Sequence, residues 1–228
     1  SNKGNTMSKE TGIVLCAQDV KRVLNGEKIT FRTVLSKQPA SSTVRMYCET
    51  AGEFDAKVDK WYAECLNSGQ RWIDNVAYTC PFGVIGDRLW VKETFCYIAR
   101  SSEGPMPISS ISYRADRDIN VKSAFDGQWR SPATMPRWAS RINLKIVGIN
   151  VAKRFDLTEQ AATAEGFKAT NSEFGGCKNP LRAHECPFGC NCFSARENYA
   201  NALVIKYGIG TLDYNPWTWV LEFKLLTP

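Results

Sequence analysis

The sequence predicts an α+β fold in which a small β-barrel is flanked by helices and interrupted by long loop insertions. Three observations favour this class. Several segments alternate apolar and polar residues, as strands with one buried face do. Single short helical patterns separate those segments. Long stretches rich in Ser, Pro, Gly and Asp interrupt them. With 228 residues, 43% apolar and 23% charged, the chain has the size and composition to bury a core without disulfides.

The N-terminal third is expected to contain one helix followed by one strand. Residues 17–26 place their apolar side chains on one helical face, and Gly26 suits the position after a helix C-cap. Residues 29–35 (ITFRTVL) have the composition of a strand. Residues 36–80 are expected to be irregular, with 55–69 (DAKVDKWYAECLNSG) forming a helix inside them.

The middle of the chain is expected to contain two long strands separated by a long, loop-rich insertion. Residues 86–95 (GDRLWVKETF) and 142–152 (INLKIVGINVA) both alternate apolar and polar positions. Between them, residues 100–138 are rich in loop-forming residues, and only 111–115 (ISYRA) has strand character.

The C-terminal third is expected to contain two capped helices and a final strand. Asp156 is an N-cap candidate with Glu159 three residues later, and Gly166 would end that helix. Ser194 and Glu197 form a second capping box, which opens the helix ARENYANALVIKYG. The segment NPWTWVLEFKLL is the last strand, and its tryptophans are assigned mainly to the core.

The charge distribution favours an anionic partner. The net charge is +6, and no acidic residue occurs between Asp126 and Asp156. A surface of one sign attracts polyphosphate backbones. Arg137 and Trp138 would hold a phosphate and stack on a base. The alternative is a strand with an outer charged face and a core tryptophan. The basic residues of the stretch are Arg130, Arg137, Arg141, Lys145, Lys153 and Arg154.

Lys28 and Glu165 occupy similar positions in the sequence, because each lies beside a glycine that ends a predicted helix. Such ends lead into loops at the rim of a barrel, where polar groups converge. A lysine and a glutamate in one cleft shift each other's pKa and act as base and acid. Arg32 is the second cation at this junction. The alternative is that both side chains are solvated and make no contact.

A cysteine cluster between residues 175 and 192 is a candidate structural zinc site. Four thiolates, or three thiolates with the only histidine, would close a tetrahedral shell and leave no position for water. The spacing is not a paired C-x-x-C signature, and free thiols in a loop are the alternative. The candidate ligands are Cys177, Cys186, Cys190 and Cys192, with His184 as a substitute. No organic cofactor is indicated.

Four stretches together resemble the ASCH-domain proteins of the PUA-like superfamily, especially the larger forms encoded by phages and prophages. They are LNGEKITFRTV, CPFGVIGDRLWVKETF, MPRWASRINLKIVGINVAKRFDLTEQAATAEGF and NPWTWVLEFKLL. The resemblance implies a PUA-like barrel. It also implies a single ASCH domain over 11–228, preceded by a disordered or artificial segment 1–10, with insertions at about 36–80, 100–130 and 167–193.

The resemblance implies RNA or nucleotide binding in a cleft beside the G-x-K motif, here Gly26-Glu27-Lys28. Lys28 and Arg32 would contact phosphate or base edges, and Glu165 would accept a hydrogen bond from an exocyclic amine. An aromatic ring at Phe31 would stack on a base. The candidate ligand-binding residues are Lys28, Phe31, Arg32, Glu93, Arg137, Trp138 and Glu165.

A short bacterial branch of the same family hydrolyses N4-acetylcytidine with a Lys, a Thr and a Glu. The Lys and Glu match Lys28 and Glu165, whereas the Thr position is occupied by Phe31. Thr30 and Thr33 are near but out of register. Because a phenyl ring has no nucleophilic oxygen, binding ranks first and amide hydrolysis second. A phage morphogenesis or host-interaction protein is the third alternative.

No apolar run approaches the roughly 18 residues that a membrane-spanning helix needs, and the N-terminus lacks a signal-peptide pattern. The expected location is therefore the cytoplasm of a bacterial host. The expected partner is RNA or a nucleoside rather than a membrane. The oligomeric state stays open.

Overall fold

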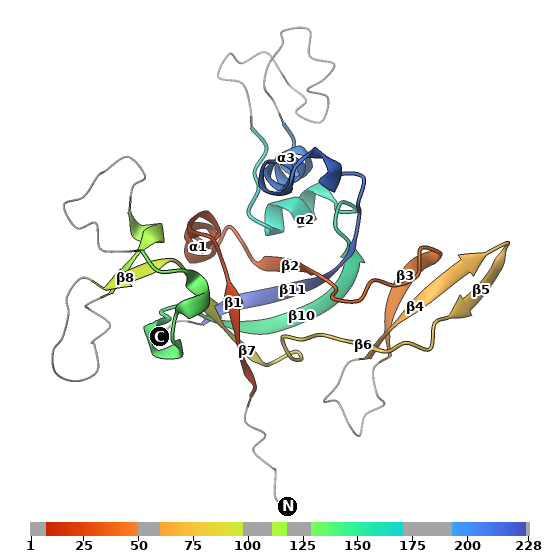
Figure 1. Ribbon diagram of the computed structural model, residues 1–228, viewed down its shortest axis with the longest axis horizontal. Helices are drawn as coiled ribbons and strands as arrows, with labels where there is room; N and C mark the ends of the chain where they lie inside the picture. Colours follow the sequence, from red (N-terminus) through yellow and green to blue (C-terminus); the bar gives the residue numbers. More distant parts are fainter. Residues whose placement is uncertain (1–7, 50–59, 98–110, 118–128, 171–192, 227–228) are drawn as a thin grey trace, which may run out of the picture. The chain divides into compact units, whose positions relative to one another are not determined.

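The protein divides into two compact units, where the sequence resemblance predicts one domain. Unit 1 comprises Ser1–Gly26, Ile85–Val147 and Phe223–Pro228, and unit 2 comprises Glu27–Val84 and Gly148–Glu222. The computed structural model describes residues 8–49, 60–97, 111–117, 129–170 and 193–226 (Figure 1).

Unit 1 is built on a sheet in which β1 (Glu10–Val14) runs parallel to β7 (Arg88–Lys92), and β7 runs antiparallel to the first residues of β10 (Asn143–Lys153). A separate pair is formed by β8 (Phe95–Tyr97) and β9 (Ile111–Tyr113). The helices that the structure describes in unit 1 are α1 (Ala17–Leu24), η2 (Arg114–Asp116), η3 (Pro132–Thr134) and η4 (Arg137–Ala139).

Two expectations for unit 1 need correction. Residues 86–95 were expected to be one strand, but the chain leaves the sheet after Lys92 and pairs with a new partner from Phe95 onward. The segment 1–10 was expected to be disordered or artificial, and only its residues 8–10 are among those that the structure describes. Lys9 instead donates its backbone N–H to Asp87 over 2.9 Å, and Glu10 begins β1. Both differences depend on which backbone groups pair with each other. The periodicity of the side chains does not predict this pairing.

Unit 2 contains β2 (Thr30–Val34) antiparallel to β11 (Trp217–Leu226), and a second sheet of β3 (Thr43–Glu49), β4 (Lys60–Asn67) and β5 (Gln70–Ile73). The short β6 (Tyr78–Thr79) pairs with the start of β4. Within its described residues, unit 2 also contains the helices α2 (Glu159–Ala164), α3 (Ala195–Tyr207) and η6 (Ile209–Thr211). Strands β10 and β11 each run from one unit into the other.

The helix expected over residues 55–69 is wrong for the part that the structure describes. Trp61, Ala63 and Cys65 are buried while the residues between them are more exposed, which is the two-residue period of a strand. At the end of β4, Ser68 and Gly69 adopt φ values of 49° and 82°. This left-handed pair is the tight turn that leads into β5.

The core of unit 2 confirms that the C-terminal strand supplies core tryptophans. Trp219 is 3% exposed and meets Trp61 edge to face, with ring centroids 6.1 Å apart. Trp217 is partly buried against the same cluster. The buried members are Leu35, Met46, Trp61, Ala63, Cys65, Tyr78, Val151 and Trp219.

A strand-rich α+β fold is confirmed, whereas the expected barrel is not formed by the described residues. In the strand order β1-β7-β10-β11-β2, the first strand and the last strand are both edges. Neither β1 nor β2 pairs with a further strand among the described residues. Part of the strand content comes from 43–73, a stretch that was expected to be largely irregular. No described helix has the length and hydropathy to span a membrane.

The predicted helix ends are confirmed with one exception. Gly26 follows α1 with a φ of 72°, and the reciprocal bonds of Ser194 and Glu197 open α3. The N-cap of α2 is Thr158, whose Oγ1 accepts from Ala161 N, and not Asp156. Asp156 instead accepts a hydrogen bond from Asn215 over 2.9 Å.

Candidate functional site

The end of α2 lies against the start of β2 in unit 2. Lys28 and Glu165 form an isolated antiparallel bridge, and Ile29 N donates to Ala164 O over 2.8 Å. Gly166 ends the helix with a φ of 88° and donates to Thr163 O over 2.8 Å. These backbone bonds hold Glu165 beside Lys28, which lies two residues before β2, the strand that carries Arg32.

The side chains of Lys28, Arg32 and Glu165 form a buried ionic cluster. Lys28 Nζ donates to Glu165 Oε2 over 2.7 Å and to Glu165 O over 3.1 Å. Arg32 Nε lies 3.2 Å from Glu165 Oε1. The three side chains are 5%, 8% and 3% exposed, in chain order. Two cations thus share one carboxylate away from solvent, which leaves an excess of positive charge.

The contact between Arg32 and Glu165 is an ion pair without hydrogen-bond alignment. Both Arg32 Nε and Glu165 Oε1 are buried and have no hydrogen-bond partner within the described residues. Arg32 Nη1 is buried and unpartnered in the same way. Buried guanidinium nitrogens normally find acceptors, so the cluster retains unused donor capacity.

Thr30 is the hydroxyl on the face of the cluster. Lys28, just before β2, and Arg32, within it, reach the same carboxylate, so we infer that Thr30, midway between them, points to the same side. Thr30 is 7% exposed, and its Oγ1 has no hydrogen-bond partner in the parts of the chain that are described. Strand alternation directs Phe31 and Thr33 to the opposite face.

Phe31 makes an aromatic contact on that opposite face. Its ring meets the ring of Phe82 edge to face, with centroids 5.8 Å apart. Lys28 and Glu165 converge as expected. Phe31, however, is directed away from their side of the strand. Its stacking role stays a prediction.

Tyr199 of α3 is a neighbour of the cluster that the sequence reasoning missed. It is 5% exposed and packs edge to face against Phe155 and Phe167, at 6.4 and 5.4 Å between centroids. Burial, followed by the negative charge of Glu165, raises the pKa of Tyr199 to about 12, against the opposing effect of Arg32 and Arg154. The phenol is therefore a neutral donor at ordinary pH.

Comparisons of this chain with protein-family models, with curated proteins and with solved structures found no match. The function of the cluster is therefore inferred from its own chemistry and from the sequence motifs.

We expect Tyr199 to make the folded state sensitive to alkali. Its pKa is about 12 when folded and near 10 when unfolded, so the unfolded chain loses this proton first. Stability is unaffected below pH 10 and falls between pH 10 and 12, by up to about 1.4 kcal/mol per pH unit. Urea unfolding of wild type and Tyr199→Phe between pH 8 and 11 measures this. Equal slopes above pH 10 would contradict the assignment.

Glu93, a predicted ligand-binding residue, belongs to unit 1 and has its carboxylate already engaged. It is 1% exposed, and its two oxygens accept from Arg141 at 2.9 and 3.1 Å. Arg141 also binds both oxygens of Asp116, each at 2.8 Å. Burial raises the pKa of Glu93, although the hydrogen bonds and charge of Arg141 oppose the shift. This network links the end of β7, η2 and the segment before β10.

Arg137 and Trp138 lie at the surface of unit 1. Arg137 Nε donates to Glu10 over 3.0 Å, and its Nη2 donates to Asn143 over 2.7 Å. Trp138 is 46% exposed and stacks with Tyr97 at 6.4 Å, with 20° between the ring planes. The alternative of a core tryptophan is therefore wrong. Arg130 lies 4.9 Å from the Tyr97 ring, so cations and aromatic rings alternate here.

The predicted zinc ligands Cys177, Cys186, Cys190 and Cys192, and the substitute His184, lie outside the described residues. Structural zinc stays a prediction. Cysteines elsewhere in the chain behave partly as expected for small hydrophobes. Cys65 and Cys96 are buried, whereas Cys16 is exposed.

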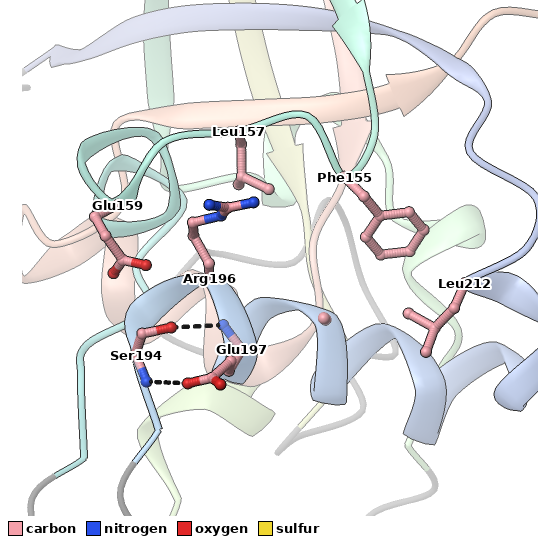
Figure 2. Close-up of a pocket in the computed structure, with 8 residues that line it drawn as sticks. Phe155, Leu157, Glu159, Ser194, Arg196, Glu197 and Leu212 are labelled. Carbon is pink, nitrogen blue, oxygen red and sulfur yellow. Dashed lines mark hydrogen bonds between the residues drawn. The ribbon is translucent and has the colours of Figure 1, made fainter. Parts of the chain in front are cut away.

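A pocket of about 550 Å³ lies where α2 and α3 meet. Figure 2 shows the reciprocal hydrogen bonds of Ser194 and Glu197 along it, with the Arg196 side chain extending toward Leu157. Glu159 Oε2 accepts from Ala195 N over 3.0 Å, so this carboxylate also binds the N-terminus of α3. Since helix capping engages both carboxylates, we assign no ligand to this pocket.

Proposed function

We propose that this protein binds RNA or a modified nucleoside at the Lys28–Arg32–Glu165 cluster, within a PUA-like fold of the ASCH type. The observation that carries the proposal is the buried excess of positive charge, together with Arg32 Nη1, which has no hydrogen-bond partner among the described residues. A nucleobase carbonyl or a phosphate supplies the missing acceptors. Glu165 has lone pairs left to accept from an exocyclic amine.

The surface of unit 1 supports a nucleic-acid partner over a small metabolite. Exposed Trp138 and its stacked neighbour Tyr97 offer an aromatic face, and Arg130 adds a cation beside it. Aromatic rings next to arginines bind single-stranded bases without strong sequence preference. The net charge of +6 adds a general attraction to phosphate.

Hydrolysis of an N4-acyl cytidine is the second candidate, and the buried hydroxyl of Thr30 is what favours it. This oxygen lies on the strand face between Lys28 and Arg32 and has no partner within the described residues. Lys28 Nζ donates to Glu165 in this arrangement, so Glu165 would have to take that proton before Lys28 acts as a base. Binding needs no such rearrangement and ranks first.

Calorimetric titration with N4-acetylcytidine, cytidine and a short RNA tests the proposal. We expect Lys28→Met and Arg32→Met each to weaken binding about 10- to 100-fold, because each removes a charge-assisted hydrogen bond worth about 1.5–3 kcal/mol. Lys206→Met, on the exposed side of α3, is the matched control. Unchanged affinity in both cluster variants, or no binding by wild type, would reject the proposal.

Chromatography of overnight incubations with N4-acetylcytidine separates binding from hydrolysis. If the protein is an enzyme, wild type releases cytidine, and Thr30→Val abolishes release while leaving affinity largely intact. Because Phe31 is directed to the other face of β2, Phe31→Thr is expected to create no activity. Release by Phe31→Thr but not by wild type would instead place the family's nucleophile at this position.

A further inference from the structure

The sheet of β3, β4 and β5 carries arginines and tyrosines on one face. Register pairs Arg45 with Glu64, and Tyr47 with Tyr62, so these four side chains share a face. Arg71 reaches the same glutamate from β5. We call the set Arg45, Tyr47, Tyr62, Glu64 and Arg71 the hairpin platform.

The hairpin platform carries more positive than negative charge. Glu64 pairs with Arg45 over 2.9 Å and with Arg71 over 3.0 Å, and is 13% exposed. The two arginines are 69% and 68% exposed. One carboxylate therefore fixes the positions of two guanidinium groups. A guanidinium has five N–H donors, so each keeps donors directed at solvent.

Aromatic rings lie beside these cations. Tyr47 and Tyr62 stack with centroids 6.0 Å apart and 29° between planes. A hollow of about 360 Å³ is bounded by both arginines, Tyr47, Glu64, Trp72 and Ile73. This volume lies in the range of roughly 300–1,000 Å³ that is typical of ligand pockets.

We propose that the hairpin platform binds single-stranded nucleic acid, with a base stacked on the aromatic rings and flanking phosphates on Arg45 and Arg71. The inference rests on the proposed function and restricts its ligand class. A second contact surface in unit 2 implies that the ligand is an oligonucleotide rather than a free nucleoside. Stacking is worth about 1–3 kcal/mol per base. An acidic peptide would use the arginines but would gain little from the rings.

Fluorescence anisotropy with labelled 12-nucleotide oligo(U) and oligo(dT) tests the platform in the full chain. We expect Arg45→Gln/Arg71→Gln to weaken oligonucleotide binding at least tenfold and to reduce the salt dependence by about two phosphate contacts. Tyr47→Leu is expected to weaken binding about fivefold or more. Neither change is expected to alter affinity for N4-acetylcytidine or cytidine. Lys206→Gln is the charge-matched control, and thermal unfolding verifies that each variant folds.

The outcomes separate the platform from the Lys28 cluster. Oligonucleotide affinity that is unchanged in both platform variants overturns the inference, whether or not nucleosides bind. A different outcome is that oligonucleotides bind through the platform while Lys28→Met changes the affinity for no ligand. This result supports the inference and rejects the proposed function. Competition by polyglutamate that survives Tyr47→Leu would identify a peptide surface and overturn the inference. A preference between oligo(U) and oligo(dT) distinguishes RNA from DNA.

Discussion

Glu165→Gln is expected to lower the free energy of unfolding by about 3–5 kcal/mol, because it leaves two buried cations without a counter-charge. Lys28 and Arg32 are 5% and 8% exposed, so water cannot easily replace the lost carboxylate. Lys28→Met is expected to cost less, since Arg32 and Glu165 then form a balanced pair. Urea unfolding at pH 7 measures both changes.

An exposed ion pair in the same unit provides the control. Lys168 and Glu27 are 2.6 Å apart, with side chains 68% and 32% exposed. Glu27→Gln is therefore expected to change stability by no more than about 1 kcal/mol. If Glu165→Gln costs no more than Glu27→Gln, the cluster is hydrated in solution and its proposed binding chemistry loses its basis.

Arg141→Met is expected to destabilise the protein by about 3–5 kcal/mol at pH 7. Arg141 supplies the only hydrogen bonds to the Glu93 carboxylate within the described residues, and Glu93 is 1% exposed. Without the guanidinium, the pKa of Glu93 rises further above its unfolded value. The variant then keeps most of its stability below about pH 4.3, where both states are protonated, and loses it as pH rises.

The pH dependence distinguishes this mechanism from a general packing defect. We expect the stability difference between wild type and Arg141→Met to shrink from pH 7 to pH 5. Glu93→Gln in the Arg141→Met background is expected to recover at least half of the loss at pH 7, because it removes the buried charge. A difference that is constant over this pH range, with no recovery in the double variant, would contradict the electrostatic explanation.

Local patterns predicted part of the fold. The strand β10, the helix after Ser194 and the turn after Gly26 follow from alternation, capping chemistry and a positive φ, which depend on neighbouring residues alone. The segment from Trp61 to Cys65 was misassigned because its apolar residues are compatible with two periods. Only the pairing with β3 decides between them.

The candidate site was only partly predictable, because its geometry depends on contacts between distant segments. Helix-end glycines pointed to Lys28 and Glu165. The side of β2 that faces Glu165 depends on how the strand pairs with β11, so the aromatic Phe31 was favoured over the hydroxyl of Thr30. Tyr199 lies on a helix with ordinary core spacing, and nothing in its local sequence marks its charged neighbours.

The contact between Lys28 and Glu165 is expected to form later in folding than local contacts. The two residues are 137 positions apart, so their contact requires the closure of a very long loop. The turn from β4 to β5 closes over only two residues, and such hairpins form within microseconds. On a translating ribosome, Lys28 emerges long before its counter-ion has been synthesised. The nascent chain therefore exposes this cation, with strand β2, until most of unit 2 has emerged.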